Sequence, residues 1–354
     1  MDSRINIIIP VYNRENLIKA CLDSVCNQTY ANWVATIVDD GSTDSSLAIC
    51  DSYKKKDPRF KVFHQENQGI AGARNTGLEK ALEDQETEYI MFLDSDDILE
   101  PVAMERALHT MLKNQADMVQ WQPYDFDTDE KDPWNIEGND YRYDDSFQVE
   151  NYKFDASNHC EIEIGSKGAL WTLLDTKGLG ADKRFHLLWN NCRCVWTKCC
   201  KRELYENVRC PIGKSYEDDF IVDDLFMNAK KIIFMNDSLT NYRKHPNNSI
   251  KGMKLKDRLD KTQCERNRFV HAKSFNDNEL TKLAGHNVLI SSINSYMESV
   301  DASQRNKEVL KLLRNTIKGS VKLLSKTDKI VYLGFSIVPG IMLPIYRKYR
   351  STKG

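Results

Sequence analysis

The sequence has no long hydrophobic run, no repeated CxxC pair and little glycine or proline. Its 354 residues include only 16 Gly and 9 Pro, which excludes collagen-like and low-complexity chains. The N-terminal apolar run is broken by polar residues too early for a signal-peptide core. Ten cysteines without an export signal indicate reduced thiols. We therefore expect a folded, cytoplasmic protein.

The chain also lacks a strong net charge, since 52 acidic residues nearly balance 50 basic ones. The balance is uneven: acidic residues dominate between Asp84 and Glu150, and basic residues dominate after Ser303. An acidic segment suits a cation site, and a basic tail suits an anionic surface such as lipid headgroups. Because no RNA-binding aromatic motif accompanies the basic tail, we expect no nucleic-acid partner.

Short apolar runs alternate with helical patterns over the first 120 residues. The runs at 5–11, 33–38, 60–64 and 89–93 predict strands with a helix after each of the first three. Such runs, joined by helices, form a parallel sheet that is covered on both faces and binds ligands at the carboxyl ends of its strands. Further along, the pattern predicts a strand at 117–121, loops and short strands at 125–165, a helix near 220–229, strands at 231–235 and 239–242, and helices from 254 onward.

Polar motifs stand at the carboxyl ends of three predicted strands. Asp94-Ser95-Asp96-Asp97 follows the fourth predicted strand. Carboxylates crowded in this way stay ionised when a cation offsets their charge. Mg²⁺ or Mn²⁺, which bind oxygen ligands, would be the simplest such cation. A turn with a helix cap is the alternative. Residues 38–44 contain an aspartate that could accept a hydrogen bond from a nucleobase or a ribose hydroxyl. Residues 68–75 form a Gly-rich turn that leads into a helix, where Arg74 could bind a phosphate.

Four segments, in this order and spacing, resemble the family 2 glycosyltransferases: Ile9 to Asn13, Val38 to Asp44, Ala73 to Gly77, and Phe92 to Asp97. The resemblance implies an α/β protein of the GT-A fold, a Rossmann-like mixed sheet flanked by helices, with a helical C-terminal extension. It implies a nucleotide-sugar-binding half at 1–120, an acceptor-binding half with the catalytic base at 121–250, and a helical region with a basic tail at 251–354.

The resemblance also implies site residues, position by position. The nucleotide-sugar donor would be bound by Pro10, Tyr12, Asp40, Arg74, Asp94 and Ser95. Asp94 and Asp96 would form the DxD motif that holds Mn²⁺ or Mg²⁺, with Asp96 nearest the metal. His245 resembles a histidine that some members place near the metal, although a histidine beside Lys244 and Pro246 is also common in surface loops.

The segment Tyr216 to Phe220 resembles the part of the family that holds the catalytic base, which implies Asp218 as the base and Trp196, Lys198 and Glu217 as acceptor-binding residues. Inverting transfer needs a carboxylate to take the acceptor's proton while the anomeric carbon is attacked opposite the leaving diphosphate. Because other acidic residues flank Asp218, the catalytic base could instead be the residue one position before or after it. A solvated acidic helix start would explain some of these carboxylates.

The C-terminal tail pairs a basic face with an apolar one, and residues 330–346 carry no charge. This uncharged stretch is shorter than the ~20 residues of a spanning helix. We expect a peripheral anchor on the anionic inner face of the cell membrane. The alternative is an ordinary C-terminal element packed on the core.

The expected activity is transfer of a sugar, with inversion, from a UDP-sugar to a lipid-linked glycan acceptor. The expected setting is the synthesis of a bacterial surface polysaccharide such as capsule, exopolysaccharide or lipopolysaccharide. Two other functions stay open. A sugar-phosphate nucleotidyltransferase would need a basic Gly-rich loop after the first strand, where this chain has Tyr12 to Glu15. A non-catalytic nucleotide-sugar-binding protein is the other.

Overall fold

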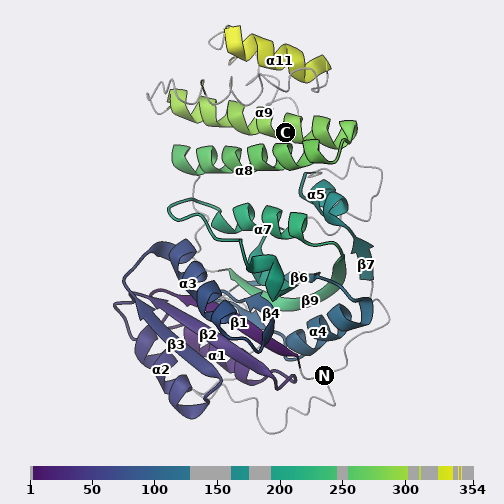
Figure 1. Ribbon diagram of the computed structural model, residues 1–354. Helices are drawn as coiled ribbons and strands as arrows, with labels where there is room; N and C mark the ends of the chain where they lie inside the picture. The colour runs from purple at the N-terminus through teal and green to yellow at the C-terminus, as the bar shows by residue number, and fades with distance from the viewer. Residues whose placement is uncertain are drawn as a thin grey trace. The chain divides into compact units, whose positions relative to one another are not determined.

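The computed structural model describes residues 3–127, 161–174, 193–244, 254–301 and 326–337, with a few single positions after 301 (Figure 1). The chain divides into two units. The first contains Met1–Leu173, Ala181–Gly213 and Glu217–Ser249, and the second contains Leu174–Gly180, Lys214–Tyr216 and Ile250–Gly354.

The first half of the sheet has the predicted parallel order. β1 (Arg4–Val11), β2 (Trp33–Asp40), β3 (Phe60–Gln65) and β4 (Thr87–Phe92) pair in the order β3-β2-β1-β4, all in parallel. They are joined by α1 (Ile18–Cys26), α2 (Ser46–Lys56) and α3 (Gly69–Glu83). The sequence prediction of this β-α repeat is confirmed.

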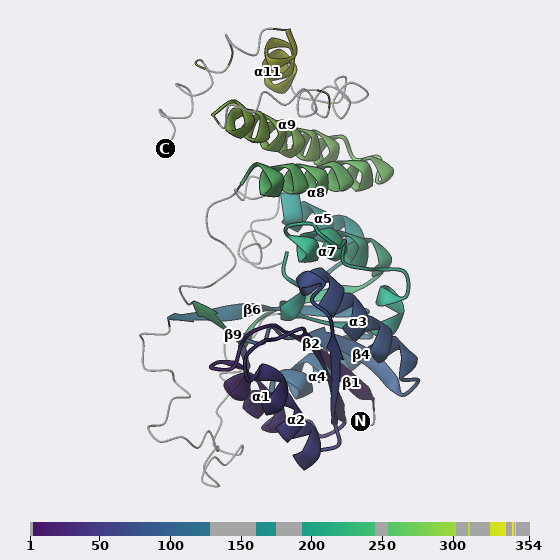
Figure 2. The ribbon, with the colours of Figure 1, turned by 90° about the vertical axis from the view of Figure 1, so that its left-hand side faces the viewer.

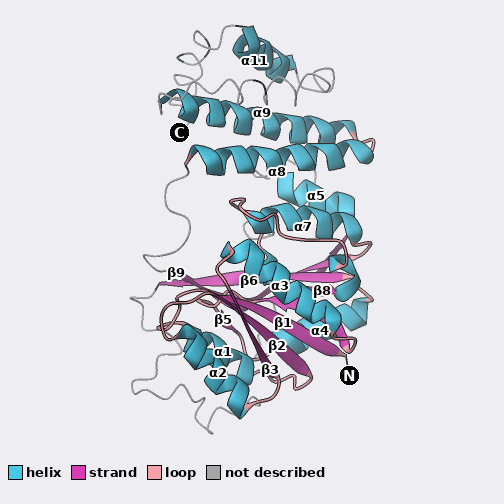
Figure 3. Ribbon diagram, turned by 60° about the vertical axis from the view of Figure 1, so that its left-hand side comes forward, coloured by secondary structure: helices cyan, strands magenta, loops and turns pink. Residues whose placement is uncertain are grey.

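Alternation along β1 explains how both faces of the sheet are covered. Ile5, Ile7 and Ile9 belong to one core cluster with side chains of α1 and α2, because successive side chains of a strand point to opposite faces. Ile8 points to the other face, where α3 packs, and a side chain at Gly77 of α3 would clash with it. Figure 3 shows α3 on the opposite side of the strands from α1 and α2.

The second half makes the sheet mixed. β8 (Lys198–Lys201) runs antiparallel to both β4 and β6 (Met118–Asp127), and β6 runs parallel to β9 (Ile232–Lys244). The short strands β5 (Ile98–Leu99) and β7 (Glu161–Ile164) pair antiparallel with β9. The other elements that the structure describes here are α4 (Ala103–Asn114), α5 (Ser166–Leu174), of which all but Leu174 belongs to the first unit, the 3₁₀ helices η4 (Val195–Thr197) and η5 (Arg202–Tyr205), and α7 (Glu217–Asn228).

The prediction of two separate strands at 231–235 and 239–242 is wrong, because β9 continues through Asn236, Asp237 and Ser238. A shift in its pairing with β6 falls beside this polar triplet, and such an irregularity bends a strand locally without ending it. The Asp237 side chain is buried and pairs with Arg106 of α4 at 3.5 Å. Asn236-Asp237-Ser238, which has the composition of a turn, is therefore part of a continuous strand.

From residue 254 onward, the described part of the second unit is helical, as predicted. α8 (Leu255–Ser274) and α9 (Asn278–Asp301) lie side by side in Figures 1 and 2, and the Thr262 hydroxyl of α8 bonds to Ser291 and Ser295 of α9 at 2.8 and 3.0 Å. α11 spans Lys326–Ile337. None of the helices described here has the length and apolar character to cross a bilayer. Most of the predicted basic helix between Lys311 and Lys326 lies outside the described residues.

Candidate active site

A cavity of about 310 Å³ opens in the first unit at the carboxyl ends of β1, β2 and β4. Six of the predicted donor-binding and metal-binding residues line it: Pro10, Tyr12, Asp40, Asp94, Ser95 and Asp96. The other lining residues are Val11, Arg14, Asn67, Gly69, Ile70 and Ala73. The cavity occupies the sheet edge where ligands of parallel α/β sheets bind.

The loop after β1 is fixed by the loop after β2. Asn13 has a left-handed backbone, with φ of 51°, a conformation that asparagine tolerates better than most residues. Its side-chain oxygen accepts a hydrogen bond from the Thr43 amide at 2.9 Å, and its own amide donates to the Ser42 hydroxyl at 3.0 Å. The Arg14 amide donates to the Ser46 hydroxyl at 2.7 Å. These bonds hold Tyr12 and Arg14 at the cavity.

The two consecutive aspartates at the end of β2 have different positions. Asp39 is fully buried and accepts from the His64 ring at 2.7 Å. Asp40 lines the cavity, and its Oδ1 accepts from the Gln65 side chain at 2.7 Å and the Gln68 amide at 2.9 Å. The sequence motif contains both aspartates as candidates for binding the nucleotide, and of the two it is Asp40 that lines the cavity.

Arg74 of α3 joins two motifs that are far apart in the sequence. It is almost completely buried, and one terminal nitrogen donates to Asp94 Oδ1 at 2.7 Å while the other donates to Glu217 Oε1 of α7. Charge-assisted bonds of this kind are among the stronger ones in proteins. Arg74 does not line the cavity, so this geometry differs from the phosphate contact that the sequence suggests.

The three aspartates after β4 have separate environments. Asp94 and Asp96 line the cavity, and burial raises the pKa of Asp94 while Arg74 opposes the rise. Asp97 is buried, and its Oδ1 accepts from the Arg243 amide at 3.0 Å. Burial and the neighbouring Asp96 and Asp94 raise the pKa of Asp97 well above its usual range. Asp97 therefore anchors the loop to β9, and Asp94 and Asp96 remain at the cavity.

Asp218 lies in the first turn of α7, next to Glu217, and is partly exposed. Burial, followed by the Glu217 carboxylate, raises the pKa of Asp218 to about 7, while Arg74 acts against the rise. A carboxylate with a pKa near neutrality is suited to take up and release a proton. Asp218 does not line the cavity, but Arg74 and Glu217 connect it to Asp94.

The predicted acceptor residues are largely enclosed. Trp196 is buried and stacks on Tyr242, with ring centroids 5.3 Å apart. Lys198 is fully buried, and its amine donates to the Cys194 carbonyl and lies 5.5 Å from the Phe226 ring centroid. Glu217 is held by Arg74. These positions favour packing roles, and acceptor contacts stay predictions. His245 lies outside the described residues.

Asp94 and Asp96 are the residues that fit a divalent cation. In the described ranges, no group of three or more His, Cys, Asp or Glu side chains is arranged to hold a metal ion. Two carboxylates on one loop beside an open cavity, completed by phosphate oxygens of a substrate, are nevertheless a donor set that Mg²⁺ takes. The residues present therefore agree with the expected Mn²⁺ or Mg²⁺.

Arg14 is a cavity residue to which sequence reasoning assigned no role. Its Nε lies 3.4 Å from Asp96 Oδ2. Asn67 and Ile70 also line the cavity without having been predicted. The signal for all three is their position just after β1 and β3, Arg14 and Asn67 in loops and Ile70 in the first turn of α3, since the segments that follow the strands at this edge of the sheet meet at one site.

Comparisons with known proteins agree with this geometry. Residues 6–167 match the family model described as Glycosyl transferase family 2. Glycosyltransferase GlyG of Streptococcus pneumoniae serotype 4 is 30% identical over 246 residues, which cover 69% of this chain and 72% of GlyG. Glycosyltransferase GlyA of the same organism is 33% identical over 243 residues, but the chain spans only 31% of its length.

Among solved structures, S. aureus TarS 1-349 in complex with UDP-GlcNAc has a TM-score of 0.61 at 18% identity, covering 92% of this chain and 82% of that one. At this identity the likeness shows the fold. It confirms the predicted GT-A-like arrangement of a mixed sheet flanked by helices.

Proposed function

The chain belongs to glycosyltransferase family 2, and from this membership we propose that it transfers a sugar from a UDP-sugar to a glycan acceptor with inversion at the anomeric carbon. The observation that supports this most is one connected set of contacts. Asp94 and Asp96 line the cavity. The Arg74 guanidinium binds both Asp94 and Glu217, and Glu217 is next to Asp218 in the sequence. These contacts link the proposed donor site to Glu217, the residue next to the proposed base.

Donor binding is assigned to the cavity loops. Asp40 would accept hydrogen bonds from a nucleobase N–H or a ribose hydroxyl, and its position in the cavity lining supports this role. Tyr12, which is 46% exposed at the same cavity, offers a ring face to the base. UDP is the proposed nucleotide because TarS, which shares the fold, was solved with UDP-GlcNAc.

Asp218 is the proposed base. Its carboxylate takes the proton of the acceptor hydroxyl as that oxygen attacks the anomeric carbon. Arg74 restrains Glu217, the residue next to the base, and Asp94 in the donor loop. Asp94 and Asp96 would hold the divalent cation, which when bound offsets the charge that grows on the leaving diphosphate.

A screen of nucleotide sugars for thermal stabilisation tests the donor assignment. A ligand that binds the folded state raises the apparent melting temperature by mass action. We expect UDP-sugars to raise it in Mn²⁺ and to raise it less in EDTA, with GDP-sugars as the comparison. Absence of any shift with every nucleotide sugar would contradict the proposal, and a shift without any UDP release would favour a non-catalytic binding protein.

The proposed base gives the reaction a defined pH dependence. Because the pKa of Asp218 is raised to about 7, the carboxyl is protonated below that pH and cannot accept a proton. We expect kcat/KM to fall on the acid side with an apparent pKa near 7 in the wild type. A rate that stays constant between about pH 5 and pH 8 would exclude Asp218 as the base.

The acceptor is proposed to be lipid-linked and part of a surface polysaccharide. The support comes from the tail: Ile330 and Leu333 of α11 are 70% and 49% exposed, and basic residues surround this segment in the sequence. Apolar side chains flanked by basic ones suit the surface of an anionic membrane.

Deletion of residues 330–354 tests the membrane proposal. The deletion removes exposed apolar side chains and basic residues while leaving every proposed catalytic position intact. We expect the truncated protein to leave the membrane fraction, to keep its donor affinity, and to lose more activity toward a lipid-linked acceptor than toward a soluble one. High salt should release the full-length protein only partly, since salt screens charges but not apolar contacts. Loss of donor binding after truncation would show that the tail belongs to the core.

A further inference from the structure

Arg14 is the one Lys or Arg among the residues that line the cavity, all of which belong to the described part of the chain. Three carboxylates, those of Asp40, Asp94 and Asp96, line the same cavity. A nucleotide-sugar diphosphate would add further negative charge there. Arg74 does not balance it, because Arg74 does not line the cavity and its charge is already offset by Asp94 and Glu217.

The backbone of Arg14 is fixed, but its guanidinium is held only by long contacts. The amide donates to Ser46 at 2.7 Å. The side chain, 27% exposed, has its Nε 3.4 Å from Asp96 Oδ2, and its NH1 donates to the Tyr12 and Asn13 carbonyls at 3.4 and 3.3 Å. Hydrogen bonds weaken with length beyond about 3.2 Å. The guanidinium can therefore leave these partners at little cost.

We propose that Arg14 exchanges Asp96 for the diphosphate of the donor. Without donor, Arg14 offsets the charge of Asp96 at the open cavity. When donor and cation bind, Asp96 turns to the cation and Arg14 bonds to the phosphate oxygens, for which its planar fork is suited. This inference rests on the proposed function, and it adds a phosphate-binding residue that also competes with metal for Asp96.

The exchange predicts two effects of opposite sign for Arg14→Gln, a variant that removes the charge and keeps much of the side chain. Binding of UDP in the presence of Mn²⁺ should weaken by about 10- to 100-fold, since charge-assisted bonds to phosphate are lost. Binding of Mn²⁺ alone should tighten by about two- to fivefold, since Asp96 loses a competing cation. A purely structural role for Arg14 would not tighten metal binding.

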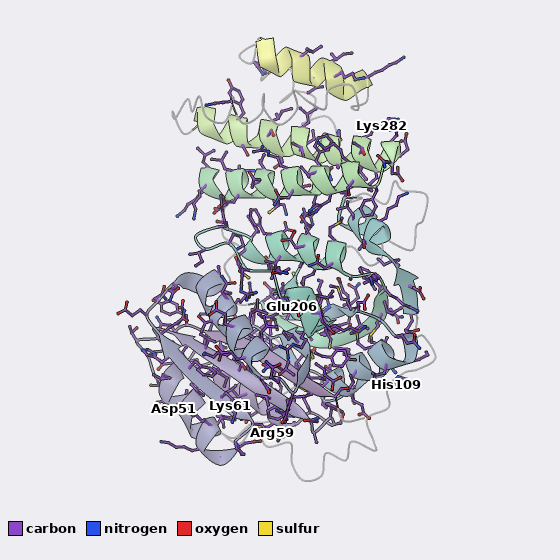
Figure 4. All side chains as sticks on the ribbon, in the orientation of Figure 1. Asp51, Arg59, Lys61, His109, Glu206 and Lys282 are labelled. Carbon is purple, nitrogen blue, oxygen red and sulfur yellow. The ribbon has the colours of Figure 1, made fainter. Side chains whose placement is uncertain are left out.

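The test measures three affinities in the full-length protein. Calorimetry gives the affinity for UDP with Mn²⁺ and for uridine, and the spectrum of free Mn²⁺ in electron paramagnetic resonance gives the affinity for metal alone. Lys61→Gln is the matched control, because Lys61 is exposed on β3 and does not line the cavity (Figure 4). Arg14→Lys should recover part of the UDP affinity, because lysine keeps the charge without the fork.

We expect uridine affinity to be unchanged in all three variants and UDP affinity to fall mainly in Arg14→Gln. Equal losses for UDP and uridine, or Mn²⁺ binding that does not tighten, would overturn the exchange. If the wild type binds neither UDP nor uridine, the proposed function itself is wrong, and this outcome is distinguished from the others by the wild-type titration alone.

Discussion

Replacing Asp218 with Asn lowers turnover by roughly 10²-fold or more in the mechanism proposed here, while donor affinity stays at the wild-type value. Asparagine keeps the shape of the side chain but cannot take a proton. Asp218 does not line the donor cavity, so its substitution leaves the lining unchanged. The measurements are the rate of UDP release in the presence of acceptor and the affinity for UDP by calorimetry.

The neighbouring residues provide the controls for this register. Asp219 is buried and pairs with Arg193 at 3.3 Å, so Asp219→Asn should affect stability more than turnover. Glu217→Gln breaks the pair with Arg74 and should lower turnover less than Asp218→Asn. If Asp219→Asn is inactive and Asp218→Asn is active, the base has been placed one residue away from its true position.

Replacing Asp96 with Ala should lower transfer by roughly 10³-fold and weaken donor binding as well, because a carboxylate of the cation site is lost. This joint loss distinguishes Asp96 from Asp218, whose substitution affects the rate alone. Asp51→Ala is the control for the loss of one negative charge, since Asp51 lies on α2 and does not line the cavity (Figure 4). Full activity of the wild type in EDTA would contradict a metal-dependent reaction.

The first four strands and their helices could be predicted from sequence because each signal is local. β-branched runs such as Ile5 to Val11 are buried on both faces of a parallel sheet, and helical spacing separates them. The motifs at the strand ends follow from this order, since parallel strands bring their carboxyl ends to one edge. Six predicted residues therefore line one cavity.

The contacts of Arg74 could not be predicted in this way. The sequence indicates an arginine beside a Gly-rich turn, but the choice between phosphate and carboxylate depends on Glu217, which is 143 residues away. Sequence spacing carries no information on which long-range partner a guanidinium meets. The same limit applies to Lys198, a charged residue that the family resemblance implies for acceptor binding and that the fold buries completely.

Local polarity also misled the prediction of β9. Asn236-Asp237-Ser238 has the composition of a turn, yet Arg106 from α4 pairs with Asp237 and the pairing with β6 shifts beside it. A tertiary ion pair thus overrides a local preference. The left-handed backbone of Asn13 suits asparagine, but its position could not be predicted locally either, because the bonds to Ser42 and Thr43 that stabilise it come from a different loop.

The most direct test of the proposed inverting transfer is proton NMR of a UDP-α-sugar incubated with the enzyme and Mn²⁺, with water or a glycan as acceptor. Attack opposite the leaving diphosphate inverts the anomeric centre. We expect UDP and a β-configured product to appear together, at a rate that falls strongly in Asp218→Asn. An α-configured product appearing first, or UDP release that is unchanged in Asp218→Asn, would contradict it.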